Sequence, residues 1–218
     1  MRMNSNIYKY VYLIVSLLTV FAAQAQTTEK YTKVTNIQEV RQVFENIKKA
    51  SATIDADFVQ EKKIDILENT LISKGKFLFK QKNSLRLEYA SPSYYLVVMS
   101  GAKMLIKDAN KKTKIDGKGS KLFTQIQNIM TGILAGQVVD SKDFKYELYK
   151  SETNYKIKLY PQTGAIKDLL NEVEFVTQIS TLKAQSMTLF EKSGDVTIMK
   201  FKNVKMNIPL DDKVFLVH

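Results

Sequence analysis

The side chains that most often perform chemistry in proteins are scarce in this sequence. The only histidine is His218, the last residue, and there is no cysteine. A Ser-His-Asp triad, a Cys-His pair and a histidine-based metal site therefore lack their main residues. No glycine-rich loop of the kind that cradles phosphate is present either. The inventory disfavours hydrolase, zinc-enzyme and nucleotide-binding functions.

One group of carboxylates has a spacing that acid/base chemistry could use: Asp55, Asp57 and Glu61. These residues alternate with apolar ones, which places them on the polar face of a predicted strand, and we interpret them as surface charge. Asp211 and Asp212 are interpreted as a turn before a final strand. The sequence thus predicts a binding protein and not an enzyme, with no cofactor and no metal.

The N-terminus has the pattern of a secretory signal peptide. Arg2 and Lys9 precede an apolar run over residues 11–23, and small residues at Ala23 and Ala25 predict cleavage after Ala25. A membrane anchor is the alternative, but the run is shorter than the roughly 20 residues that span a bilayer. We therefore expect residues 1–25 to be removed and the protein to be exported to a periplasm.

Residues 26–218 are long enough for a single domain with a sizeable core. The net charge is +11, but no nucleic-acid-binding motif is present, and export makes nucleic acid an unexpected partner. Many lysines alternate with apolar residues, as on the solvated face of a sheet. We expect a monomer.

The elements that would carry a binding site centre on residues 75–101, which predict three consecutive antiparallel strands. One alternating set of side chains is apolar, while the other set is largely charged. The apolar set consists of Phe77, Phe79, Leu85, Leu87 and Tyr89. Residues 94–99 are apolar on both sides, so Leu96 and Val98 belong either to a doubly buried strand or to a ligand cavity.

The surrounding sequence extends this sheet. Residues 35–50 have helical apolar spacing, and residues 53–62 predict a strand with Phe58 on its apolar side. Further alternating segments are residues 71–79, 103–107, 144–149, 155–160, 173–179, 185–190 and 196–206. The expected fold is α+β and mainly β: a single curved antiparallel sheet of about ten or eleven strands with helices packed on one face.

A second helix is predicted over residues 122–134. Its dense apolar face comprises Leu122, Phe123, Ile126, Ile129, Met130, Ile133 and Leu134. Glycines at positions 119, 132 and 136 weaken the element and permit hinging. Two interpretations are open: an ordinary core helix, or a lid that moves aside for a ligand.

A lysine-rich segment over residues 111–121 precedes this helix. We interpret it as a solvated loop or, alternatively, as a docking surface for an acidic partner or anionic lipid. The docking interpretation rests on Lys111, Lys112 and Lys114.

Several motifs occur in an order that resembles the LolA family, the periplasmic carriers of lipoproteins to the outer membrane. After the signal peptide and amphipathic helix come Asp57-Phe58-Val59-Gln60 and Gly75-Lys76-Phe77-Leu78-Phe79-Lys80, and then a strand that ends before Pro92. The run from Leu96 to Gly101 and the late segment from Asn203 to Asp212, followed by Phe215, complete the pattern. The resemblance covers nearly the whole mature chain.

This resemblance implies a half-open, incomplete β-barrel whose concave apolar face binds acyl chains under movable helices. The implied acyl-chain site is Phe58, Phe77, Phe79, Leu85, Leu87, Tyr89, Leu96 and Val98. The implied lid is Leu122, Phe123, Ile126, Ile129, Met130 and Ile133. The implied partners are acylated lipoproteins, an inner-membrane ABC-type releasing complex and an outer-membrane acceptor.

The sequence departs from the family at the position that latches the lid. LolA proteins carry an arginine followed by proline just after the strand that begins at Gly75, whereas this chain has Gln81 and Lys82. Glutamine cannot form the charged, forked contact of arginine. Leu85 and Leu87 also stand where LolA has bulky aromatics. Either the lid is held differently or the cargo differs.

The leading hypothesis is a periplasmic carrier that ferries lipoproteins between the two membranes. The first alternative is a carrier of another amphiphile, such as a glycolipid, on the same fold. The second alternative is a lipoprotein-sensing regulatory protein.

Overall fold

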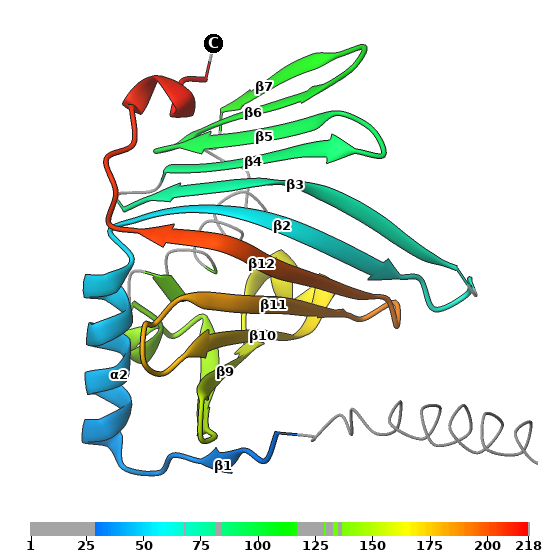
Figure 1. Ribbon diagram of the computed structural model, residues 1–218. Helices are drawn as coiled ribbons and strands as arrows, with labels where there is room; N and C mark the ends of the chain where they lie inside the picture. Colours follow the sequence, from blue (N-terminus) through cyan, green and yellow to red (C-terminus); the bar gives the residue numbers. More distant parts are fainter. Residues whose placement is uncertain are drawn as a thin grey trace, which may run out of the picture. The chain divides into compact units, whose positions relative to one another are not determined.

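A computed structural model describes residues 29–67, 69–81, 84–116, 129, 133–134 and 137–217 of the chain. Its main element is one twelve-stranded sheet in the order β1-β8-β9-β10-β11-β12-β2-β3-β4-β5-β6-β7 (Figure 1). Every pairing in it is antiparallel. Within the described residues the outer strands β1 and β7 do not pair with each other, so the sheet is an open half-barrel, as expected.

The strands are β1 Thr32–Lys33, β2 Thr53–Lys63, β3 Thr70–Lys80, β4 Ser84–Ser91, β5 Tyr95–Ser100, β6 Lys103–Asp108, β7 Lys112–Asp116, β8 Phe144–Lys150, β9 Asn154–Pro161, β10 Leu170–Gln178, β11 Ala184–Glu191 and β12 Val196–Met206. The helices are α2 Ile37–Ala50, α4 Gly164–Leu169 and the 3-10 turns Gln137–Asp140 and Asp212–Phe215. Except for the final strand expected after Asp212, the strand predictions are confirmed with small shifts of their ends. Two strands were not predicted, β1 in the polar lead-in and β7 in the lysine-rich segment.

The loop interpretation of residues 111–121 is wrong for the part that forms β7. Lysine-rich sequence favours a loop locally, but β6 supplies a partner, and Lys103 to Lys107 pair in register with Asp116 to Lys112. Tertiary pairing overrides the weak local preference. The remainder of that segment, residues 117–121, lies outside the described residues.

Helix α2 forms where its N-cap and apolar stripe predict it. The side chain of Asn36 accepts hydrogen bonds from the backbone N–H groups of Gln38 and Glu39, which satisfies two otherwise unpaired donors. Its buried side chains are Val40, Val43, Phe44 and Ile47. Ile37, the first residue of the helix, is half exposed.

The sheet has a separate apolar cluster on each face. The larger one lies on the concave face and includes the buried side of α2 together with residues from β2, β3, β4 and β8 to β12. The smaller one joins Leu78, Leu96, Val98 and Leu105 to Phe215 of the C-terminal 3-10 turn. The chain therefore ends in a 3-10 turn that packs on the convex face, and the predicted final strand is wrong.

Candidate ligand-binding site

Most of the predicted acyl-chain residues gather on the concave face. Phe58, Phe77, Phe79 and Leu85 are buried in the larger cluster, and Leu87 and Tyr89 pack against it. Strand pairing explains this grouping, because Phe77 lies opposite Leu87 and Phe79 opposite Leu85. Side chains that face each other across antiparallel strands point to the same side of the sheet.

Leu96 and Val98 are separated from this group. Val98 pairs with Arg86, and Leu96 with Glu88, so both point to the convex face. There they contact the cluster closed by Phe215. The sequence pattern of β5 is apolar on both sides because both of its faces are covered, which is the other interpretation weighed for this strand.

A small apolar cavity lies in the concave face. Its volume is about 10 Å³, which is the space of about one water molecule. It is lined by Ile54, Phe77, Ile133, Leu134, Phe175, Ala184, Met187 and Phe201. Four of these residues, on β10, β11 and β12, were not predicted as site residues. Their alternation predicted strands, but it did not reveal that β12 pairs with β2, which places β10 to β12 on the other side of β2 from β3.

The predicted helix over residues 122–134, which carries the predicted lid, is described at three positions. Ile129, Ile133 and Leu134 are helical and buried in the concave cluster. Leu122, Phe123, Ile126 and Met130 lie outside the described residues. Because Ile133 and Leu134 form one wall of the cavity, this segment covers apolar surface of the sheet.

Ser51 connects this segment to α2. Its side chain is fully buried, and its hydroxyl oxygen lies 2.6 Å from the carbonyl oxygens of both Ile47 and Leu134. A single hydroxyl proton is shared between the two acceptors. We call Ile133 and Leu134 the covering segment. The Ser51 hydroxyl therefore links the C-terminal end of α2 to this segment through Leu134.

The predicted latch position makes a different contact. The side-chain amide of Gln81 donates a hydrogen bond of 2.6 Å to the carbonyl oxygen of Lys48, and its backbone N–H donates to Ala52. Lys48 lies in the last turn of α2. Among the described residues, Gln81 therefore fastens α2 to the end of β3.

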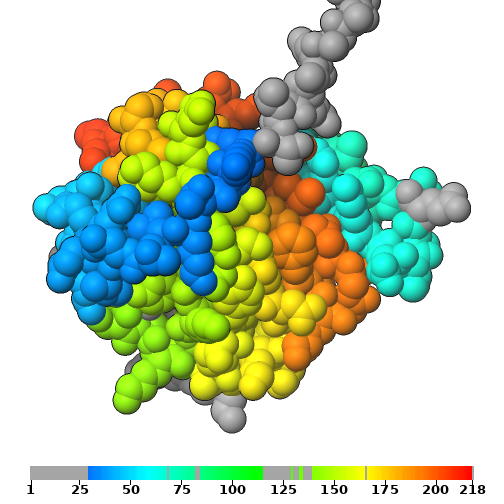
Figure 2. Space-filling model, turned by 90° about the horizontal axis from the view of Figure 1, so that it is seen from below, coloured from blue at the N-terminus to red at the C-terminus, as the bar shows by residue number. Residues whose placement is uncertain are grey.

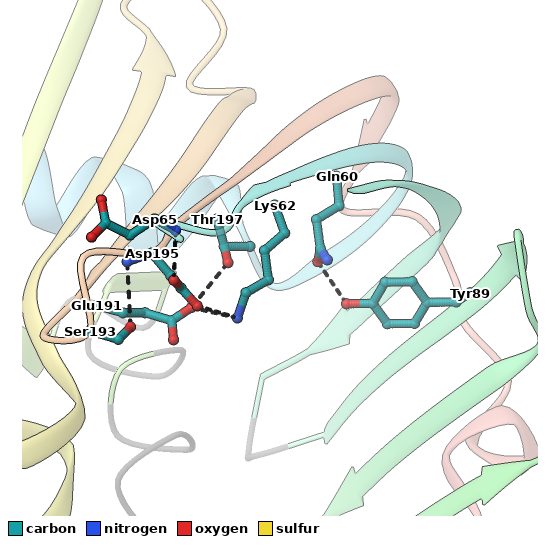
Figure 3. A network of polar contacts seen from close by, with 8 residues as sticks. All are labelled: Gln60, Lys62, Asp65, Tyr89, Glu191, Ser193, Asp195 and Thr197. Atoms are coloured by element: carbon teal, nitrogen blue, oxygen red, sulfur yellow. Dashed lines mark hydrogen bonds and ion pairs between the residues drawn. The ribbon is translucent and has the colours of Figure 1, made fainter. Parts of the chain in front are cut away.

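Aromatic rings border the concave face on the side of β4 and β5. The Tyr89 ring is 5.1 Å from the Phe58 ring and 6.0 Å from the Tyr95 ring. Burial raises the pKa of the Tyr89 phenol to about 12, with a smaller contribution from Tyr95. The Tyr89 hydroxyl donates to the side-chain oxygen of Gln60 at 2.8 Å (Figure 3). The Tyr89 hydroxyl is thus hydrogen-bonded and neutral at physiological pH.

The carboxylates considered for catalysis lie on the convex face with polar partners. Asp55 is 3.0 Å from Lys76, Glu61 is 2.8 Å from Lys200, and Asp57 accepts a hydrogen bond from Asn203. Across the described ranges, no group of three histidine, cysteine, aspartate or glutamate side chains could hold a metal ion. The described arrangement is suited to binding apolar groups, and the carboxylates serve as surface charge.

The three lysines of the predicted docking surface are exposed. Lys112 and Lys114 lie on β7, and Lys111 precedes it in the β6–β7 turn. In the portion of the chain with described structure, no helix is long and apolar enough to cross a membrane.

A family model and a curated relative that match this sequence carry the same description. The family model described as "Outer membrane lipoprotein carrier protein LolA" matches residues 49–218. An outer-membrane lipoprotein carrier protein from Methylococcus capsulatus is 25% identical over 211 residues, which cover 95% of this chain and 92% of that protein.

The fold is also similar to solved structures. A LolA superfamily protein from Nitrosomonas europaea matches with a TM-score of 0.45 and 9% identity, over 84% of this chain and 99% of that one. The MucA/MucB complex from Pseudomonas aeruginosa contains a chain that matches with a TM-score of 0.46 and 10% identity, over 83% of this chain and 60% of that one.

Proposed function

The chain belongs to the LolA family of outer-membrane lipoprotein carriers, and on this premise we propose that it shields the acyl chains of lipoproteins on its concave face while they cross the periplasm. The proposed route begins at an inner-membrane ABC-type releasing complex and ends at an outer-membrane acceptor. The protein acts by binding and catalyses no reaction.

The observation that carries this proposal is the apolar surface beneath the covering segment. Every residue that lines the cavity is apolar, and two of them belong to the segment that closes it. In the closed arrangement the cavity holds about 10 Å³, far less than an acyl chain occupies. Binding therefore requires Ile133 and Leu134 to move away from the sheet. The covering segment exchanges its own apolar contacts for those of the ligand, so the net affinity is moderate and the cargo can be released.

The proposed acyl-chain site combines predicted and unpredicted residues. Phe58, Phe77, Phe79, Leu85, Leu87 and Tyr89 form the side near β3 and β4. Phe175, Met187 and Phe201 form the side near β10 to β12. Leu96 and Val98 have no part in the proposed site because they face the convex side.

A pair of substitutions on one strand tests the site. Met187→Glu places a charge at the cavity, whereas Ser186→Glu places it on the opposite face, where Ser186 pairs with Lys200. We expect Met187→Glu to weaken binding of a fluorescent fatty-acid probe by about tenfold or more, because an unpaired charge in an apolar site is costly. The Ser186→Glu control should bind like the native protein. Equal binding by both variants would remove the concave face as the site.

The cargo is identified by native mass spectrometry after gentle purification from the producing cell. A retained triacylated peptide supports the lipoprotein role, whereas a glycolipid or another lipid would favour the general amphiphile carrier. In cells, depletion should leave outer-membrane lipoproteins in the inner membrane. Correct placement of these lipoproteins after depletion contradicts the transport role.

A further inference from the structure

Four turns lie at one end of the sheet, which we call the hairpin end. Because the pairing is antiparallel, the β2–β3, β4–β5, β6–β7 and β11–β12 turns all fall there (Figure 1). The turns are residues 64–69, 92–94, 109–111 and 192–195. Helix α2 begins at the opposite end, where Glu39 in its first turn contacts Lys150.

Exposed apolar side chains concentrate at this end. The described part of the chain has nine large hydrophobic residues that are exposed, and seven of them lie here. Four belong to the β2–β3 hairpin and form what we call the apolar tip: Ile66 at 88%, Leu67 at 52%, Leu71 at 52% and Ile72 at 55% exposed. The others are Tyr94, Tyr95 and Leu169, which the hydrogen bond from the Lys192 N–H places beside the β11–β12 turn.

Strand pairing explains why the tip is bare. The pairing of β3 with β4 reaches only to Lys74 opposite Ser91, so among the described strands none pairs with residues 70–73 on that side. The hairpin therefore extends beyond its neighbour, and Figure 2 shows it standing out in teal from the strands beside it. Apolar side chains grouped on an exposed projection do not contribute to the stability of the fold, and such groups mark binding surfaces for a partner or a membrane.

The base of the hairpin is held in place. The Lys62 ammonium group is 3.0 Å from Glu191 and 3.4 Å from Asp195, and the Asp65 N–H donates to Asp195 at 3.1 Å (Figure 3). These contacts fasten the β2–β3 hairpin to the β11–β12 turn. The apolar tip is thus presented from a fixed base and does not fold back onto the sheet.

The exposed charges of the described residues around the tip are predominantly basic. Lys63 and Lys74 are exposed on the two strands of the hairpin. Lys111 is exposed in the β6–β7 turn and Lys112 at the start of β7. The Lys107 ammonium group lies 5.8 Å from the centre of the Tyr94 ring.

The acidic groups among the described residues here are largely engaged. Asp195 and Glu191 face Lys62, and the Asp108 carboxylate accepts the N–H groups of Asn110 and Lys111, which lower its pKa. Asp65, in the β2–β3 turn, packs its carboxyl against Gly194, and Glu68 of the same turn lies outside the described residues. Anionic groups of a partner would therefore meet lysines at this end.

We propose that the hairpin end docks on an anionic lipid bilayer, with the apolar tip entering the boundary between headgroups and acyl chains. Exposed aliphatic side chains flanked by tyrosines and lysines have the composition of interfacial membrane-binding elements. A projecting tip enters a deformable lipid surface without needing a complementary groove. The docking stands on the described contacts alone, and its use for taking or delivering cargo rests on the proposed function.

The sequence contains no tryptophan, so the fluorescence of a single introduced tryptophan reports on its own position without background. Ile66→Trp places a single indole at the tip, and Ile37→Trp places one on a half-exposed isoleucine at the opposite end. With vesicles of phosphatidylcholine and phosphatidylglycerol, we expect a blue shift and quenching by brominated acyl chains for Ile66→Trp only. Equal behaviour of the two reporters, or no change in either, overturns the proposal.

Vesicle flotation separates the apolar and the charged contributions. Leu67→Ser with Ile72→Ser should reduce binding about tenfold or more, because two aliphatic side chains no longer enter the lipid. Lys63→Gln with Lys74→Gln should reduce it by about tenfold at low salt and less at high salt. The matched control is Lys202→Gln with Lys205→Gln. It removes two exposed lysines from the half of β12 that is farther from the hairpin end, and this variant should bind vesicles like the native protein.

The outcomes distinguish docking from cargo binding. The tip variants should keep native binding of the fatty-acid probe in the absence of vesicles and should keep the native midpoint of unfolding. Probe binding that is lost while vesicle binding persists contradicts the proposed function and supports the docking inference. Vesicle binding that is equal in native protein and tip variants overturns the inference and points to a protein groove as the partner of the tip.

Discussion

Gly75 shows how a single residue shapes the candidate site. A Cβ atom at this position would lie 2.1 Å from the carbonyl oxygen of Glu88 and 2.7 Å from the Phe58 ring. Phe58 is the cross-strand partner of Gly75, so its ring covers the glycine and then reaches Tyr89. The glycine is required because β4 and the Phe58 ring occupy the space of a side chain.

The first prediction follows from this contact. Gly75→Ala should lower the free energy of unfolding by about 2–3 kcal/mol, because the added methyl overpacks a site bounded by backbone. Chemical denaturation measures the loss. Gly101→Asn is the control, since a Cβ there meets nothing within 4 Å and asparagine tolerates the positive φ of 57°. A Gly75→Ala loss no larger than that of Gly101→Asn would contradict the overpacking.

Glu147 gives a prediction about pH. Hydrogen bonds from Lys33, Tyr149 and Tyr160 lower its pKa from 4.5 to about 2. A carboxyl whose pKa is lower in the folded than in the unfolded protein stabilises the fold at every pH above its unfolded pKa. This stabilisation is lost as the pH falls from about 4.5 toward 2. Glu147→Gln should therefore cost about 1 kcal/mol at neutral pH, a value reduced by solvent screening, and almost nothing near pH 2.

Urea denaturation across this pH range checks the Glu147 prediction. The control is Glu152→Gln, an exposed residue in the turn between β8 and β9. A difference between native protein and Glu147→Gln that stays constant down to pH 2 would rule out the proposed linkage.

At the scale of elements, Ser51 and Gln81 separate two ways of fastening α2. Both side chains bind a carbonyl oxygen near the end of α2, but only Ser51 also contacts Leu134. Ser51→Ala should destabilise the fold by about 1–3 kcal/mol, since it leaves buried carbonyl groups with one fewer donor. It should also increase hydrogen exchange at residues 133–134 and speed uptake of the fatty-acid probe.

Gln81→Ala is the matched variant for this comparison. It should cost about 1 kcal/mol and leave probe uptake unchanged, because Gln81 holds α2 and not the covering segment. Faster uptake in Gln81→Ala than in Ser51→Ala would return the latch role to Gln81, as the resemblance implied.

The C-terminal 3-10 turn is a second element with a measurable role. Phe215 is 2% exposed and closes the convex cluster over Leu96 and Val98. Phe215→Ala should cost about 3–5 kcal/mol through the cavity that it leaves. Leu216→Ala, at an exposed neighbour, should change stability by less than about 0.5 kcal/mol. Similar losses in both variants would mean that the turn is not packed as described.

At the scale of the whole molecule, the closed concave face predicts the kinetics of binding. Under the proposed function, the covering segment must open before an acyl chain enters, because the cavity holds only about 10 Å³. In stopped-flow mixing, the observed rate of probe binding should therefore reach a plateau as probe concentration rises, and Ser51→Ala should raise that plateau. A rate that stays proportional to concentration would show that the site is open in solution.

The sequence by itself determined the sheet and most of its apolar face. Alternation in β2, β3 and β4 identified Phe58, Phe77, Phe79 and Leu85 as inward-facing, because successive residues of a strand point to opposite sides. The single terminal histidine and the absence of cysteine also directed the interpretation toward binding. These inferences are local, since they depend only on residue type and spacing.

Only the tertiary structure decided what each apolar side chain faces. Leu96 and Val98 look like cavity residues in the sequence, but the C-terminal turn covers them on the convex side. Phe201 and Met187 join Phe77 and Ile133 in the cavity lining because β12 pairs with β2, and no local pattern in the sequence encodes that pairing. The exposed tip likewise follows from β4 ending before it can cover β3. Burial depends on which distant segments come together, and residue spacing does not specify that.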